Sequence, residues 1–261
     1  MVNKLVPMIP EHRTYVEAFG GGGSMLLAKE PSEIEVYNDL NSGLVNFFRV
    51  LRDNIGFKEF QRLVSLTPYS REEYEAFRND WEKDEDRIGR AHKWFAVARM
   101  SFGGMFGNSF GFSRESSSRG MAQCVSAWLG AIERLPEVCQ RILRVIIENK
   151  DALDLIKTFD SPKTFFYLDP PYVLSTRKSG GYKHELSNED HQSLINLLLK
   201  LKGKVMLSGY KNPIYKKLEE SGWNRRDFNV QLQASGKTRS TKATTKKARV
   251  ESVWMNYEPA T

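Results

Sequence analysis

The sequence has few of the features that mark secreted, metal-binding or membrane proteins. It contains 2 cysteines in 261 residues, and Cys124 and Cys139 lack the paired spacing of a zinc site or a disulfide framework. No apolar run approaches the roughly 20 residues that a membrane-spanning helix needs, and no charged-then-apolar signal peptide follows Met1. We therefore expect a protein of the reducing cytoplasm with no membrane partner.

The composition is otherwise that of a globular protein with a basic surface. Hydrophobic residues make up 40% and charged residues 27% of the chain, and the formal net charge is +7. This charge suggests an anionic partner, although charge alone decides little. It is most concentrated at 235–249, SGKTRSTKATTKKAR. This stretch is either a solvated loop or a segment that lies against phosphates.

Short apolar runs alternate with helical patterns near both ends of the chain. The runs that read as strands are 15–19, 35–38, 145–148, 165–168, 204–208 and 252–257. Helical spacing follows at 24–29, 44–51 and 191–202. This alternation predicts an α/β fold with a mostly parallel sheet. Charged helical segments and the irregular stretch 101–120 interrupt the pattern, so we expect a sheet domain of 1–54 and 144–261 with residues 55–143 inserted.

A glycine run directly follows the first predicted strand, in EAFGGGGS at 17–24. Glycines at this position let the backbone pass close to a ligand at the carboxyl edge of the sheet. A flexible turn without a ligand is the alternative. The spacing is not that of a P-loop, so a phosphate-binding nucleotide site of that kind is disfavoured.

Two acidic residues follow later strands. Asp39 ends the second strand about 20 residues after the glycines, where a carboxylate can accept hydrogen bonds from ribose hydroxyls. Asp151 follows the third strand and could face an adenine amino group. Either residue could instead cap the helix that comes next, which is a common role for aspartate.

The most specific motif is YLDPPY at 167–172, which ends an apolar strand with an acid, two prolines and a tyrosine. Pro170 and Pro171 stiffen the backbone and donate no hydrogen bonds. Asp169 and the Pro170 carbonyl are acceptors suited to a substrate amino group, and Tyr172 offers a ring on which a planar base can stack. An ordinary strand-ending turn would explain one proline but not this combination.

These motifs resemble the DNA adenine N6-methyltransferases of the Dam-like family, which use S-adenosylmethionine. The resemblance runs through VEAFGGGGS, EVYNDLN, IIENKD, YLDPPY, HQSLI, LSGY and RVESVWMNY, in the family's order. It implies a Rossmann-like methyltransferase sheet and an inserted, largely helical target-recognition domain. It also implies a monomer that acts on double-stranded DNA.

The resemblance assigns roles to individual residues. Glu17, Phe19, Gly21, Gly23, Asp39, Asp151 and Asp169 would lie around S-adenosylmethionine. Asp169, Pro170, Pro171 and Tyr172 would hold the target adenine. Two departures stand out: Ala18 replaces the family's usual proline, and the family's opening glycine-lysine motif would fall just before Met1. We therefore expect weakened binding of the cofactor's methionine part.

Methylation of N6 requires the adenine to leave the duplex, because N6 is otherwise paired. Asp169 and the Pro170 carbonyl would then orient the amino group, and no covalent enzyme intermediate is needed. DNA contacts would come from the insertion and from the loop after the motif. The candidates are Arg114, Arg119, Arg177 and Lys178, and 101–120 could be a hairpin that enters the major groove.

Two alternatives remain open from the sequence, and a third is disfavoured. An RNA or protein methyltransferase can carry a related motif, although those enzymes more often have asparagine in place of Asp169. A DNA-binding remnant could have lost cofactor binding with its first motif. A cytosine C5-methyltransferase needs a nucleophilic cysteine after proline, which neither Cys124 nor Cys139 provides. The recognition sequence and a host, phage or restriction-modification origin stay undecided.

Overall fold

The computed structural model describes residues 1–173, 185–231 and 248–259. The chain divides into two compact units, one made of Met1–Leu40 with Glu148–Thr261 and one of Asn41–Ile147. The sequence placed the division at residues 55 and 144 instead. The difference arises from α3 (Ser42–Arg52), which packs against α4 (Asn54–Leu66), α6 (Arg87–Met100) and α8 (Leu135–Ile142) of the second unit.

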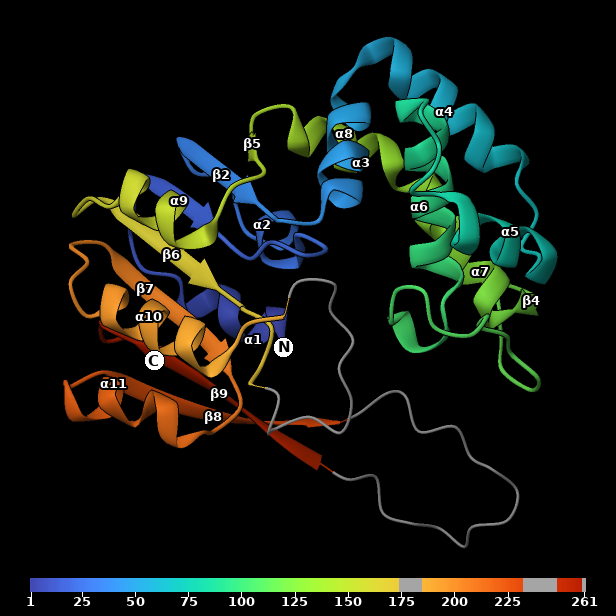
Figure 1. Ribbon diagram of the computed structural model, residues 1–261. Helices are drawn as coiled ribbons and strands as arrows, with labels where there is room; N and C mark the ends of the chain where they lie inside the picture. Colours follow the sequence, from blue (N-terminus) through green and yellow to red (C-terminus); the bar gives the residue numbers. More distant parts are fainter. Residues whose placement is uncertain (174–184, 232–247, 260–261) are drawn as a thin grey trace, which may run out of the picture. The chain divides into compact units, whose positions relative to one another are not determined.

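A mixed sheet is the centre of the first unit (Figure 1). In the described part of the chain its seven strands lie in the order β5-β2-β1-β6-β7-β9-β8. Their bounds are β1 (Thr14–Glu17), β2 (Ile34–Asn38), β5 (Ile146–Glu148), β6 (Thr164–Leu168), β7 (Lys204–Gly209), β8 (Asn224–Gln231) and β9 (Ala248–Met255). The parallel pairs β1–β2, β1–β6 and β6–β7 confirm the expected mostly parallel α/β sheet.

The far end of the sheet is antiparallel. β9 pairs antiparallel with both β7 and β8, and β8 is the edge strand. The strand β8, which reads NRRDFNVQ, was not expected from the sequence. Its charged side chains suit an edge strand, because charge discourages pairing with another chain, but they hide the alternation by which strands are found.

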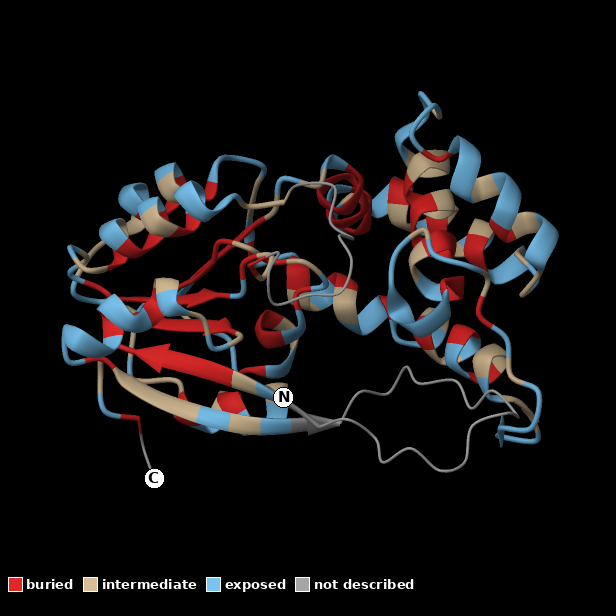
Figure 2. Ribbon diagram, turned by 60° about the horizontal axis from the view of Figure 1, so that its bottom comes forward, coloured by how far each residue is buried: buried red, intermediate tan, exposed pale blue. Residues whose placement is uncertain are grey.

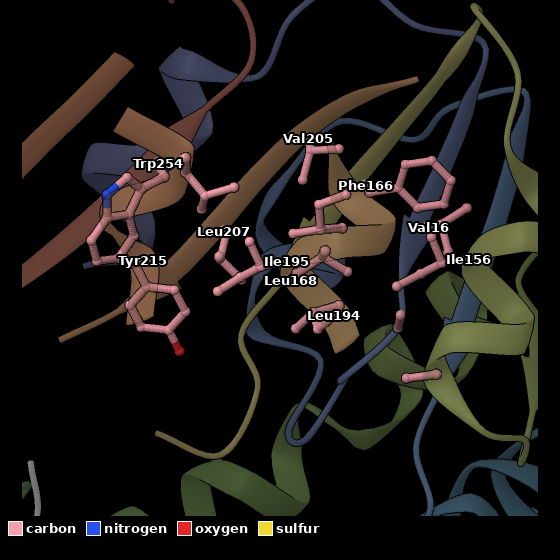
Figure 3. Close-up of a cluster of buried hydrophobic side chains, with 14 of the residues drawn as sticks. Val16, Ile156, Phe166, Leu168, Leu194, Ile195, Val205, Leu207, Tyr215 and Trp254 are labelled. Carbon is pink, nitrogen blue, oxygen red and sulfur yellow. The ribbon is translucent and has the colours of Figure 1, made fainter. Parts of the chain in front are cut away.

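Helices cover the sheet. On one face they pack around a cluster of buried side chains that includes Val16, Phe166, Leu207 and Trp254 (Figure 3). Three helices contribute to this cluster: α9 (Ala152–Phe159), α10 (Asn188–Leu198) and α11 (Lys216–Glu220). Two short helices, α1 (Val2–Leu5) and α2 (Ser24–Ala28), and the turn η1 (Val6–Met8) also bury apolar residues. The central strands are accordingly buried (Figure 2).

Local signals define where α10 begins. The side chain of Ser187 accepts a hydrogen bond from the Asp190 backbone, and the Asp190 side chain accepts one from the Ser187 backbone. This reciprocal capping satisfies two donors that the first helical turn would otherwise leave without partners. After β7, the turn η4 (Pro213–Tyr215) leads into α11 and places the Tyr215 ring in the core.

The second unit is largely helical. Besides α3, α4, α6 and α8 it contains α5 (Arg71–Asp80), α7 (Gln123–Glu133), the turn η2 (Phe102–Gly104) and a small hairpin of β3 (Ser117–Ser118) and β4 (Met121–Ala122). Its core is aromatic: the Phe47 and Phe95 rings stack with centroids 5.5 Å apart, and Phe60 meets both edge-on. Trp128 packs against Phe95. Such ring pairs stabilise a core beyond the area they bury.

Within the described residues, no helix combines the length and the apolar character that crossing a bilayer would require.

The order of strands fixes where a ligand site belongs. From β1 the chain moves outward to β2 and β5, and it then returns to β6 on the other side of β1 before continuing to β7. The crossovers therefore reverse direction between β1 and β6. In open α/β sheets, ligands bind beyond the carboxyl ends of the strands at such a reversal. Those ends carry the glycine run and the YLDPPY motif.

Candidate active site

The glycine run forms a tight turn held against the end of β2. The Gly21 amide donates to Asp39 Oδ2 at 2.8 Å, and the Tyr37 hydroxyl donates to the Gly21 carbonyl at 2.5 Å. A side chain at Gly20 would collide with the Tyr37 ring, because its Cβ would lie 2.1 Å from Cε2. Gly21 and Gly23 have φ angles of 48° and 65°, which favour glycine. The glycine run is therefore an ordered turn and not a flexible one.

Glu17 lies beneath this turn and is buried. Its Oε2 accepts hydrogen bonds from the Tyr15 hydroxyl at 2.8 Å and from the Leu26 amide at 3.0 Å. The bond from Leu26 attaches α2 to β1. Burial raises the pKa of Glu17 to about 8, although both hydrogen bonds oppose that shift. At neutral pH this carboxyl is therefore mostly protonated. Phe19, further along, is half-buried and packs against the core cluster.

Asn38 joins three strand ends and was not singled out from the sequence. Its Nδ2 donates to the carbonyls of Ala18 and Lys150, each at 3.0 Å, and its Oδ1 accepts from the Lys150 amide at 2.8 Å. The neighbouring Asn149 donates to the Asp39 carbonyl. The sequence offers one signal for this role, which is an asparagine placed at the end of a predicted strand. These contacts hold the segments after β1, β2 and β5 together.

The two acidic candidates differ in whether they cap a helix. Asn41, not Asp39, accepts from the first amides of α3, so Asp39 contacts the glycine turn instead. Asp151 does cap a helix: its Oδ1 accepts from the Leu153 and Asp154 amides at the start of α9. The capping alternative is thus excluded for Asp39 and observed for Asp151.

Asp169 lies at the carboxyl end of β6, beside β1. Because Glu17 and Tyr167 are register partners, Phe19 and Asp169 each lie two residues further along neighbouring strands. The side chain of Asp169 reaches solvent, yet surrounding protein atoms reduce its hydration. This desolvation and the charge of Glu251 raise the pKa of Asp169 to about 6, against the lowering effect of the Tyr172 and Ser208 hydroxyls.

Tyr172 is held at its hydroxyl and at its ring. The hydroxyl donates to Glu251 Oε1 on β9 at 2.8 Å. The ring meets that of Tyr210 edge-on, with centroids 4.5 Å apart and planes at 67°. Ser208, Tyr210 and Glu251 were not assigned roles from the sequence, although the segments LSGY and RVESVWMNY that contain them carried part of the resemblance.

The basic residues chosen from the insertion have partners within the second unit. Arg119 makes an exposed two-pronged ion pair with Glu133, with nitrogen to oxygen distances of 3.0 and 2.6 Å. It sits with Gly120 in the turn between β3 and β4, where both have positive φ angles of 56° and 75°. Arg114 lies over the Phe112 ring at 5.4 Å. Arg177, Lys178 and most of 235–249 lie outside the described residues.

Cys139 does not have the features of a nucleophilic thiol. Cys139 is buried, its Sγ donates to the Leu51 carbonyl at 2.8 Å, and burial raises the pKa of its thiol. A catalytic thiolate requires a lowered pKa. Cys124 is half-buried on α7. The structure thus gives no support to a mechanism that attacks a base through Cys139.

Comparisons with known proteins agree with this geometry. Residues 1–232 match the family model of D12 class N6 adenine-specific DNA methyltransferases. The chain is 27% identical to the type II methyltransferase M1.LlaDCHI of Lactococcus lactis subsp. cremoris, over 96% of this chain and 89% of that protein.

Two longer relatives match over part of their length. The DNA N-6-adenine-methyltransferase of Escherichia phage P1 is 26% identical over 76% of this chain and 26% of the relative. The modification methylase StsI of Streptococcus sanguinis is 21% identical over 76% of this chain and 31% of the relative. The chain thus spans about a quarter and a third of these two proteins. The match to the family model covers most of the chain, which therefore belongs to the D12 class of N6 adenine-specific DNA methyltransferases.

Proposed function

We propose that this chain binds S-adenosylmethionine at the ends of β1 and β2 and methylates N6 of an adenine flipped out of duplex DNA beside Asp169. The observation that carries the proposal is the position of the DPPY motif. Asp169 lies at the reversal of strand order, beside the strand that leads into the glycine turn. A base bound at one strand end would thus lie next to a cofactor bound at the other.

The residues at the ends of β1 and β2 fit a nucleoside-containing cofactor. A Cβ placed on Gly21 would meet no atom within 4 Å, so the surface of the turn is open to an approaching group. Asp39 lies beside that surface and offers a carboxylate for ribose hydroxyls. Phe19 and Gly23 complete the turn. Asp151, which follows β5, is the candidate contact for the adenine of the cofactor. When bound, S-adenosylmethionine supplies a methyl group activated by a positively charged sulfur.

Glu17 supports this site in a different way from the one the resemblance implied. Its carboxyl is occupied by the Tyr15 hydroxyl and the Leu26 amide, so we infer that it shapes the turn from below. Its contribution to cofactor binding would then be indirect. Replacement of Glu17 would weaken cofactor binding because the start of α2 and the glycine turn would lose their attachment to β1.

The chain's residues act on adenine by orientation. The Asp169 carboxylate and the Pro170 carbonyl each accept a hydrogen bond from the N6 amino group. Pro171 keeps this backbone rigid. The N6 lone pair would thereby be directed at the methyl carbon. The N–C bond would form as the sulfur–methyl bond of S-adenosylmethionine breaks, and one N6 proton would then pass to the Asp169 carboxylate. The Tyr172 ring stacks on the flipped base. Positioning and electrostatics of this kind need no covalent enzyme intermediate.

The second unit is the candidate for target recognition. Its hairpin has Arg119 and Gly120 at the turn, within the irregular stretch 101–120 for which the sequence suggested a hairpin in the major groove. Arg114 and Arg119 are proposed DNA contacts in this unit, and Arg177 and Lys178 in the loop after the motif. Arginine can hydrogen-bond two acceptors on guanine or bind phosphate, so either mode fits.

Methyl transfer tests the proposal directly. Purified protein is incubated with S-adenosylmethionine labelled in its methyl group and with plasmid DNA that lacks adenine methylation. The DNA is then digested to nucleosides. Label in N6-methyldeoxyadenosine supports the proposal, and label in 5-methylcytosine or no label at all contradicts it. Sequencing that detects N6-methyladenine in cells expressing the chain would identify the target sequence.

A further inference from the structure

Glu251 lies where strand β9 passes the end of β7. Register pairs in this antiparallel ladder include Gly209 with Ser252, so Glu251 stands opposite Tyr210, one step beyond β7. From there its carboxylate accepts the Tyr172 hydroxyl at 2.8 Å and its charge acts on Asp169. A residue about 80 positions away in sequence thus contacts the DPPY motif.

We propose that Glu251 is a positioning residue for methyl transfer: its carboxylate fixes the orientation of the Tyr172 ring, and its negative charge strengthens Asp169 as an acceptor for the target amino group. The proposal rests on the proposed function, because it concerns the same adenine site. It adds a carboxylate from the antiparallel part of the sheet to a site otherwise built from parallel strands.

The first role follows from how Tyr172 is restrained. Pro170 and Pro171 limit the backbone before it, but they leave the side-chain torsions of Tyr172 undetermined. The edge-on contact with Tyr210 restricts the ring, and the hydrogen bond to Glu251 fixes the far end of the side chain. A ring that stacks on a base has to be held within about 10–20° of the productive orientation. Loss of the Glu251 carboxylate would remove one of these restraints.

The second role follows from which groups face Asp169. Among the described residues they are Glu17 from β1, Tyr167 from β6, Ser208 from β7, Glu251 from β9, Tyr215 from η4, and Tyr172. Glu17 is mostly protonated at neutral pH, because its pKa is raised to about 8. Within this set Glu251 is therefore the source of negative charge beside Asp169.

This charge favours the transition state over the ground state. A second carboxylate beside Asp169 raises the affinity of Asp169 for a proton. As the methyl group joins N6, the nitrogen gains positive charge while it still holds both protons. That charge relieves the repulsion between the two carboxylates, so the attraction is stronger in the transition state than in the bound substrate.

Two substitutions separate the roles. Glu251→Gln keeps an oxygen that can accept the Tyr172 hydroxyl but removes the charge, and Tyr172→Phe removes the hydrogen bond but keeps the ring and the charge. Asp227→Asn is the matched control. Asp227 lies in the same hairpin and accepts hydrogen bonds from Ser252 and Arg225. Ser252 follows Glu251 directly, so this control removes a carboxylate on the opposite face of the sheet.

The measurements are kcat and KM for unmethylated plasmid DNA, and the pH dependence of kcat/KM. We expect Glu251→Gln to lower kcat about tenfold, to leave KM near that of the wild type, and to move the acidic limb of the profile to lower pH. Tyr172→Phe should raise KM, and it should move the acidic limb to higher pH, opposite to Glu251→Gln, because it removes a hydroxyl that lowers the pKa of Asp169. Asp227→Asn should match the wild type in all three.

The outcomes distinguish the two roles from each other and from the proposed function. An acidic limb that coincides in wild type and Glu251→Gln overturns the role of charge. An unchanged KM in Tyr172→Phe overturns the role of ring orientation. Circular dichroism shows whether each variant is folded. Failure of the wild-type protein to methylate adenine in any DNA contradicts the proposed function itself, before the variants are compared.

Discussion

At the scale of single residues, Asp169 links the pH of the solution to the chemistry of the site. Its pKa is raised to about 6, first by desolvation from the surrounding protein atoms and then by the charge of Glu251. Only the ionised carboxylate can accept an N6 proton and also stabilise the positive charge that develops on N6. We therefore expect kcat/KM to be highest above pH 6 and to fall as the pH decreases through about 6. Single-turnover transfer at a series of pH values measures this limb.

Replacement of Asp169 by alanine tests the same residue without a change of pH. The rate of methyl transfer should fall about 10² to 10³-fold, as is common when one well-placed electrostatic partner is removed. The fold should survive because Asp169 lies at a strand end and reaches solvent. Asp154→Ala, which removes an exposed carboxylate on α9, is the control and should stay active. A folded Asp169→Ala protein with near wild-type activity would refute the assignment.

Glu17 makes the stability of the fold depend on pH, and here the protonated carboxyl is the favoured form, whereas Asp169 acts as the ionised carboxylate. Its pKa is raised from 4.5 to about 8 by burial, so the folded state holds a proton that the unfolded state releases above about pH 4.5. The contribution of Glu17 is therefore fully present below that pH and is lost progressively as the pH rises to about 8.

The substitution Glu17→Gln should flatten this dependence, since glutamine stays neutral and can still accept from Tyr15 and Leu26. Relative to the wild type, the variant should gain on the order of a few kcal/mol in free energy of unfolding between about pH 5 and pH 8. Urea unfolding at both pH values measures the difference. Parallel losses of stability in the two proteins would show that Glu17 is ionised in the fold.

At the scale of elements, Asn38 holds three strand ends in register at the cofactor side of the sheet. Asn38→Ala would leave the Ala18 carbonyl and both backbone groups of Lys150 without these partners. Loss of buried hydrogen bonds costs about 1–3 kcal/mol for each group left without a partner. We therefore expect lower stability and faster amide exchange at 18–23 and 149–151. Asn196→Ala, an exposed substitution on α10, should change stability by less than about 0.5 kcal/mol.

The strands around the site could be predicted because each is a short apolar run that ends in a turn signal. General rules for parallel sheets then place the ends of these strands along the edge where ligands bind. The role of Asn38 could not be predicted, because its partner Lys150 is 112 residues away. The same holds for Glu251 and Tyr172, and for the pair of Arg119 with Glu133. Such contacts depend on the final fold, not on local pattern.

At the scale of the whole molecule, the net charge of +7 is meaningful only where arginines and lysines are available to phosphates. Arg119 forms an ion pair with Glu133. Its guanidinium can therefore bind a phosphate only if this pair opens. Arg114→Gln with Arg119→Gln should weaken DNA binding and reduce the slope of log affinity against log salt by about 0.9 for each phosphate that the protein no longer neutralises. Binding of S-adenosylmethionine should be unchanged. Fluorescence anisotropy at several salt concentrations measures the slope.

Glu133→Gln is the converse experiment. It removes the partner of Arg119 and should strengthen DNA binding if Arg119 contacts DNA. The cost in stability should be small, because solvent screens an ion pair that is exposed on both sides. Unchanged affinity in Glu133→Gln, together with unchanged affinity in Arg119→Gln, would place Arg119 outside the DNA interface.

The interruption of the first unit by the second has a consequence for how the protein is made. β1 is a central strand, and its two neighbours are β2 and β6. During translation β2 emerges soon after β1, whereas β6 follows only after the entire second unit. At roughly 5–20 residues per second the ribosome needs on the order of ten seconds for that stretch. Throughout this interval one edge of β1 lacks its partner strand β6 and is open to incorrect pairing.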